Sequence, residues 1–146
     1  MSIQQQAGTV ADPVSQEFLV TCLCAEWCGT CRDYRPGFDE LAQQFPDTRF
    51  RWLDIEEHAD AMGDLDIENF PTLLIQRRAL VLFFGTMLPY LNHLQRLIET
   101  FREQTPEQSR DYALSTPERS SWQENQDICS LGRLKLLAEN TKNTAS

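Results

Sequence analysis

The hydrophobic residues of the chain alternate between runs typical of strands and spacings typical of helices. An apolar run at 18–24 has strand length, and because both of its faces are apolar it predicts a buried central strand. Residues 28–45 then carry large apolar side chains at steps of three or four, which predicts a helix. Pro36 lies inside this stretch and is expected to kink that helix.

The pattern continues with shorter elements. We expect a strand at 49–55, a short helix at 59–65, strands at 73–75 and 79–84 that form a hairpin around the polar turn 76–78, and an amphipathic helix at 89–101. The order strand, helix, strand, helix, hairpin, helix predicts an α/β sandwich with a central mixed β-sheet flanked by helices.

The two ends of the chain differ from this central part. Residues 1–14 are polar and rich in glutamine, which indicates an irregular N-terminal arm. We expect one domain over 15–102 and a C-terminal extension over 103–146. The first part of that extension is polar and contains two prolines, so it is interpreted as a linker, and leucines within 129–139 indicate a possible terminal helix.

Composition and charge narrow the function. The 146 residues carry a formal net charge of −9, which argues against nucleic acid or an anionic membrane as a partner because both require a basic surface. The start of the chain lacks the pattern of a secretory signal, and the most apolar run, 79–84, is too short to span a bilayer. These features favour a soluble cytoplasmic protein.

The cysteines supply the candidate chemistry. Four of the five lie between positions 22 and 31, and such a cluster in a reducing compartment indicates redox chemistry or metal binding. Residues 25–31 read Ala-Glu-Trp-Cys-Gly-Thr-Cys. Two thiols three positions apart, here Cys28 and Cys31, can close a small disulfide ring and open it again. At the start of a helix, the dipole and the free N–H groups favour a thiolate.

The remaining cysteines leave several interpretations open. Strand alternation places Cys22 and Cys24 on one face, where they fit small buried hydrophobes, a second redox pair, or an alternative disulfide from Cys22 to Cys31. A zinc site is disfavoured because same-face strand residues rarely converge with a pair at a helix start, so no metal is expected. Cys129 fits either packing within its helix or a redox-sensitive thiol.

Three motifs together resemble the thioredoxin family over residues 15–102. The 25–31 segment differs from the common bacterial thioredoxin site mainly by Thr30 in place of proline. Phe70-Pro71-Thr72 stands where the family keeps its cis-proline, and Gly85 stands where the family has a glycine beside its substrate groove. The resemblance implies a thioredoxin fold, and the threonine suggests a less reducing redox couple.

The resemblance also implies a reaction, thiol–disulfide exchange on protein disulfides. Cys28 would attack as the thiolate, and Cys31 would resolve the mixed disulfide, so that a Cys28–Cys31 disulfide is the redox group and no further cofactor is needed. A thioredoxin reductase is the implied reductant. The residues expected to contact substrate are Trp27, Phe70, Pro71 and Gly85.

Two positions depart from the family. Thioredoxins usually bury an aspartate on the central strand and pair it with a lysine on the next, and the matching residues here are Cys22 and Trp52. The aspartate is thought to help move the proton of the resolving thiol, so its loss predicts slower protein-disulfide reduction. The departure and the extension together leave an alternative function, a binding or chaperone-like module for a dedicated partner.

Overall fold

Four strands form one mixed sheet in the order β2-β1-β3-β4 in the computed structural model, which describes residues 17–134. Strand β1 (Phe18–Cys24) lies inside the sheet, parallel to β2 (Thr48–Asp54) and antiparallel to β3 (Thr72–Arg77). Strand β4 (Leu80–Thr86) continues the sheet antiparallel to β3. Every residue of β1 is buried, so the predicted central strand and mixed α/β sheet are confirmed.

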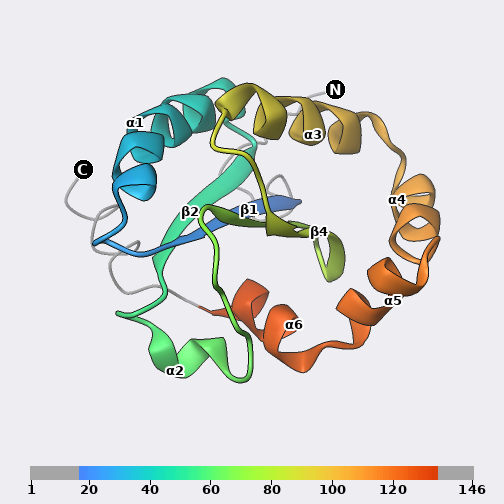
Figure 1. Cartoon of the computed structure of the whole chain (residues 1–146). Coiled ribbons are helices and arrows are strands. Elements are labelled where there is room, and N and C mark those ends of the chain that lie inside the picture. Colours follow the sequence, from blue (N-terminus) through green and yellow to red (C-terminus); the bar gives the residue numbers. More distant parts are fainter. Residues whose placement is uncertain (1–16, 135–146) are drawn as a thin grey trace, which may run out of the picture.

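One face of the sheet is covered by α1 (Gly29–Gln44) and α3 (Leu91–Glu103), which lie side by side above the strands in Figure 1. Helix α1 continues through Pro36 and buries residues at steps of three and four, as its sequence pattern predicts. These side chains meet the strand residues on the same face in one core cluster. That cluster contains Cys22, Cys24 and Cys31, so these three cysteines lie within the core between α1 and β1.

The opposite face is covered by α2 (Ala59–Met62) and α6 (Gln126–Arg133), below the sheet in Figure 1. Ile128 and Leu131 of α6 are buried in a second core cluster. It contains one residue from each strand and one from α2, namely Leu23, Leu53, Leu74, Val81 and Met62. The C-terminal extension therefore completes the hydrophobic core. Within residues 17–134, every helix falls short of the length and apolar character that a membrane span requires.

The predicted polar linker is wrong, because its residues form helices. Helix α4 (Pro106–Ala113) and α5 (Pro117–Glu124) carry the chain around the β4 side of the sheet to α6 (Figure 1). Each starts with a threonine N-cap followed by proline, and Thr105 forms a capping box with Gln108. These short helices lack a wide apolar stripe, which is why composition alone suggested a linker. The arm at 1–14 and the end of the predicted terminal helix lie outside the described residues.

A side chain of helix α5 pairs with the backbone of β4, the edge strand of the sheet. The amide of Gln123 accepts a hydrogen bond from the Val81 N–H at 2.8 Å and donates one to the Val81 carbonyl at 2.7 Å. A glutamine thus replaces the backbone of a neighbouring strand and satisfies both polar groups of Val81.

Helix α6 is held by a buried cation and by close backbone approach. The guanidinium of Arg51, on β2, donates to the carbonyls of Leu131 and Leu134, where a helix C-terminus carries partial negative charge. Gly132 packs so closely on the sheet that an added Cβ would lie 2.4 Å from the Gln76 side-chain oxygen. These contacts fix α6 against β2 and β3.

Candidate active site

Cys28 occupies the N-cap position of α1, with extended backbone angles of φ −85° and ψ 121°. Its N–H donates to the Ala25 carbonyl at 3.0 Å, and its carbonyl accepts from the Arg32 N–H at 3.1 Å. This tight turn leaves the Cys28 thiol partly exposed, whereas Cys31, within the first turn of the helix, is only 1% exposed. The sequence therefore places one accessible and one buried thiol at the start of the same helix.

The disulfide differs from the predicted one. Cys31 is bonded to Cys24, with 5.8 Å between the two Cα atoms, and Cys28 is a free thiol. In the state described here Cys31 is therefore paired with Cys24, and the Cys28–Cys31 disulfide stays a prediction. The physical reason is that Cys31 is the first buried residue of α1 and faces the sheet, where Cys24 ends β1 on the covered face. The alternative Cys22–Cys31 disulfide is not formed either.

Cys22 is a free and fully buried thiol beside this disulfide, with its Sγ 3.7 Å from the Cys24 Sγ. Burial raises the pKa of the Cys22 thiol far above its ordinary value, and the positive charge of Arg35 opposes the shift only in part. The Tyr34 hydroxyl responds to the same environment, because burial first and the Cys22 charge second raise its pKa. Cys22 therefore stays protonated at neutral pH.

Trp52 is the strand neighbour of Cys22, in register across β1 and β2. Its ring makes a T-shaped contact with Phe38, with centroids 5.6 Å apart, and the Arg35 guanidinium lies over the Trp52 ring at 4.9 Å from its centroid. The indole thus places aromatic surface beside Cys22 and has a cation over its ring.

Trp27 directly precedes Cys28 in the chain and contacts Phe70. Their ring centroids lie 5.6 Å apart in an edge-to-face arrangement. Trp27 remains 61% exposed, and its indole N–H donates to the Glu56 carboxylate at 2.7 Å. The Phe70–Pro71 peptide bond is cis, as the resemblance implies. Gly85 lies in β4 opposite Leu73, and β3 separates it from the strand that leads to the cysteines.

Asp54 organises the loop that precedes the cysteines, a role that the sequence analysis did not assign. One carboxylate oxygen accepts from the Glu26 N–H at 3.0 Å, and the other accepts from the N–H groups of Glu56 and Glu57 at 2.9 and 3.1 Å. A single side chain therefore ties the loop after β1 to the loop after β2. The local signal is an aspartate at a strand end followed by residues whose N–H groups it can bind.

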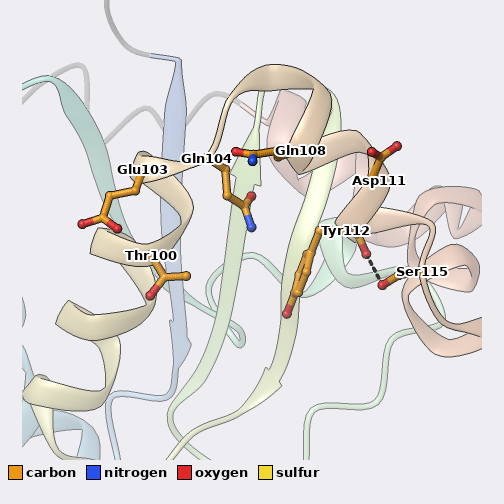
Figure 2. Close-up of a pocket in the computed structure, with 7 residues that line it drawn as sticks. All are labelled: Thr100, Glu103, Gln104, Gln108, Asp111, Tyr112 and Ser115. Atoms are coloured by element: carbon orange, nitrogen blue, oxygen red, sulfur yellow. Dashed lines mark hydrogen bonds between the residues drawn. The ribbon is translucent and has the colours of Figure 1, made fainter.

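A surface hollow elsewhere on the molecule, of about 510 Å³, contains none of the predicted site residues (Figure 2). It lies between the end of α3 and α4, and its polar lining consists of Thr100, Glu103, Gln104, Gln108, Asp111, Tyr112 and Ser115. In the part of the chain that the structure describes, no three His, Cys, Asp or Glu side chains are grouped as metal ligands would be.

Comparison with known proteins adds the family. The thioredoxin family model matches residues 4–82. A putative thioredoxin 2 of Streptomyces coelicolor is 33% identical over 75 residues, which cover 51% of this chain and 54% of the relative. Thioredoxin H2 of Arabidopsis thaliana is 33% identical over 64 residues, which cover 44% of this chain and 48% of the relative. The chain thus spans about half the length of these curated relatives.

The solved structures agree with the fold. The structure of spinach chloroplast thioredoxin f superposes with a TM-score of 0.54 and 26% identity, over 60% of this chain and 73% of that chain. Mitochondrial thioredoxin 3 of Saccharomyces cerevisiae superposes with a TM-score of 0.52 over 60% of this chain and 83% of that chain. The mixed sheet, the helix that begins at Cys28 and the family match lead to one conclusion: this chain belongs to the thioredoxin family.

Proposed function

We propose that the protein is a thiol–disulfide oxidoreductase that acts on disulfides of other proteins, with Cys28 as the attacking thiol and Cys31 as the resolving thiol. The observation that carries this proposal is the position of Cys28, a free and partly exposed thiol at the N-terminus of the 16-residue helix α1. Cys31 lies three residues further into the helix and takes part in a disulfide in this structure. Family membership supports the same chemistry.

The reaction begins with all site thiols reduced. The Cys28 thiolate attacks a substrate disulfide, one substrate sulfur leaves as a thiolate, and a mixed disulfide remains. The Cys31 thiolate then attacks the Cys28 Sγ, which releases the second substrate sulfur and forms a Cys28–Cys31 disulfide. The protons lost by Cys28 and Cys31 end on the two substrate thiols. The disulfide is the redox group, and the reaction requires no other cofactor.

The substrate segment is proposed to bind beside Trp27 and the cis Phe70–Pro71 bond. The edge-to-face contact between Trp27 and Phe70 gives an apolar surface, and the 61% exposure of Trp27 leaves that surface open. Gly85 is assigned to the same groove by the family resemblance alone.

The reaction is proposed to be slower than in a typical thioredoxin. Cys22, in the place of the usual aspartate, is buried and its raised pKa keeps it protonated, so it cannot accept the proton of Cys31 at neutral pH. Trp52 supplies no charge in the place of the usual lysine. Thr30 between the two cysteines is proposed to make the couple less reducing.

The reductant is proposed to be a thioredoxin reductase, and the compartment the cytoplasm. Another solved structure that this chain resembles is a complex of ferredoxin:thioredoxin reductase with thioredoxin f2, in which the match is 25% identical with a TM-score of 0.54. Electron transfer from a reductase of this kind to Cys28 would follow the same exchange steps in reverse.

A second candidate function is a binding module for a dedicated partner. The surface side chains Leu88 and Tyr90, at the end of the sheet just before α3, are strongly exposed and favour a protein contact. Helix α6 is not expected to be the docking element, because its apolar residues are buried in the core.

One experiment separates the two functions. The Cys31→Ser variant of the full chain is expected to trap mixed disulfides on Cys28 when it is incubated with an extract of proteins that contain disulfides. The wild type is expected to reduce insulin disulfides. Cys28→Ser is the matched control and should do neither. Absence of both trapping and insulin reduction would leave only the binding module.

A further inference from the structure

We propose that Cys24 is a third redox cysteine of the site, which competes with Cys28 for Cys31. The site would then alternate between a Cys28–Cys31 disulfide, formed by the proposed function on which this inference rests, and a buried Cys24–Cys31 disulfide. In the second state Cys28 is a free thiol although the site is oxidised. This is the state that the structure describes.

The position of Cys31 between two partners carries the proposal. On one side, Cys24 at the end of β1 is already bonded to it, and the 5.8 Å between their Cα atoms is an ordinary disulfide separation. On the other side, Cys28 is the N-cap residue three positions before Cys31, and two cysteines at this spacing can close a small disulfide ring. Cys31 can therefore form a disulfide with either thiol without a change in the fold.

Burial distinguishes the two disulfides. Cys24 is 0% exposed and Cys31 is 1% exposed, so thiols in solution cannot reach either sulfur of the bond between them. Cys28 is partly exposed and borders the same core cluster. The buried disulfide is therefore accessible only through Cys28, which acts as the connection between that bond and the solvent.

The exchange step leaves the number of electrons unchanged. From the Cys28–Cys31 disulfide, the Cys24 sulfur attacks the Cys31 Sγ, the Cys24–Cys31 bond forms, the Cys28–Cys31 bond breaks, and Cys28 leaves as a thiolate. The proton of Cys24 passes to Cys28 or to water. In the reverse direction, the Cys28 thiolate attacks the Cys31 Sγ and Cys24 takes up a proton.

The consequence is a site with two modes of action. When Cys31 is bonded to Cys24, a substrate disulfide attacked by Cys28 has no resolving thiol and stays attached as a mixed disulfide. When the buried bond is opened through Cys28, the ordinary resolving reaction returns. Cys24 would thus convert the protein from a dithiol reductase into one that holds a substrate as a mixed disulfide on the single thiol of Cys28.

The test maps disulfides and free thiols in the full chain. The oxidised wild type, treated with excess iodoacetamide under native conditions, is expected to be alkylated at Cys28, and mass spectrometry should identify a Cys24–Cys31 disulfide. In Cys24→Ser, oxidation should give Cys28–Cys31 and protect Cys28. Cys22→Ser is the matched control, since Cys22 is equally buried on the same strand face but free, and it should retain the Cys24–Cys31 bond. Protection of Cys28 in the oxidised wild type would overturn the proposal.

A second measurement tests the route through Cys28. Cys28→Ser, oxidised with diamide during refolding so that the oxidant reaches both sulfurs, should form the Cys24–Cys31 disulfide. Under native conditions dithiothreitol should then reduce this bond at least about tenfold more slowly than in the wild type. In denaturant, where both sulfurs are exposed, the two proteins should be reduced at the same rate. Equal rates in the native state, or no Cys24–Cys31 bond in this variant, would overturn the proposal.

These outcomes are separate from those of the proposed function. Insulin reduction by the wild type, with Cys28 protected in its oxidised state, would retain the oxidoreductase and refute the role of Cys24. Failure of the wild type to reduce insulin, with the buried disulfide found by mapping, would refute the oxidoreductase and retain the Cys24–Cys31 bond.

Discussion

The burial of α6 against the sheet predicts a large stability loss when Leu131 is shortened. Leu131 is 0% exposed in the second core cluster, and replacing a buried leucine by alanine typically costs about 3–5 kcal/mol in free energy of unfolding. The Leu131→Ala variant keeps the backbone carbonyl that accepts from Arg51, so the change isolates side-chain packing. The same substitution at Leu114, which is 56% exposed, is the matched control.

The packing of α6 also limits the size of this loss. Two fully buried side chains, Ile128 and Leu131, supply roughly 3–6 kcal/mol together as an upper value. Removal of most of the Leu131 contribution should therefore bring α6 close to detachment, in which case the helix would open before the sheet unfolds. The amide protons of α6 should then exchange faster than those of β1.

Urea unfolding and native-state hydrogen exchange measure these two effects. We expect Leu131→Ala to lower the free energy of unfolding by about 3 kcal/mol or to give a separate early loss of α6 protection, and Leu114→Ala to change it by less than about 0.5 kcal/mol. A Leu131→Ala variant as stable as Leu114→Ala, with α6 protection unchanged, would refute the conclusion that the C-terminal extension completes the core.

Three other substitutions test the environment of the site and the surface. Tyr34→Phe removes a buried hydroxyl that has no hydrogen-bond partner among residues 17–134, so we expect equal or up to about 1 kcal/mol higher stability in urea unfolding, and a loss of more than that amount would contradict this view. Cys22→Asp places a carboxylate beside the site sulfurs, so it should speed insulin reduction while lowering the thermal midpoint; a rate no faster than the wild type would show that proton transfer from Cys31 is not limiting. The hydrogen bonds from Arg102 lower the pKa of Asp47, so this pair stabilises the fold above the ordinary carboxyl pKa, and the stabilisation disappears as pH falls through the lowered value. Because the Asp47 carboxylate is exposed, Asp47→Asn should cost less than about 1 kcal/mol at pH 7, as measured by urea unfolding, and this cost should shrink as the pH is lowered toward 2. An equal cost at both pH values would contradict the assignment.

Much of the fold could be predicted because its signals are local. The two-sided apolar run gave β1, the helical spacing after Cys28 gave α1, and the hairpin pattern gave β3 and β4, although the turn lies at Arg78 and Ala79 and Gly85 falls inside β4. The threonine–proline pairs that begin α4 and α5 are also local signals, but their polar helices were hidden by composition. The contact between Arg51 and the end of α6 joins residues far apart in sequence and has no local signature.

The cysteine pairing shows a different limit of the sequence. Motif spacing identifies Cys28 and Cys31 as a possible pair, but it does not report the direction in which the Cys31 side chain points. That direction follows from the burial of α1 on β1, which brings Cys31 to Cys24. Disulfide choice among four clustered thiols therefore depends on tertiary packing rather than on spacing.

The hydrogen bonds between Gln123 and Val81 have a consequence for the behaviour of the protein at high concentration. An uncovered sheet edge can pair with the edge of another molecule and begin aggregation. Gln123 occupies the two backbone groups of Val81 that such pairing would use. The extension therefore hinders edge-to-edge association through β4. A chain cut before α5 would lose this protection together with the α6 part of its core.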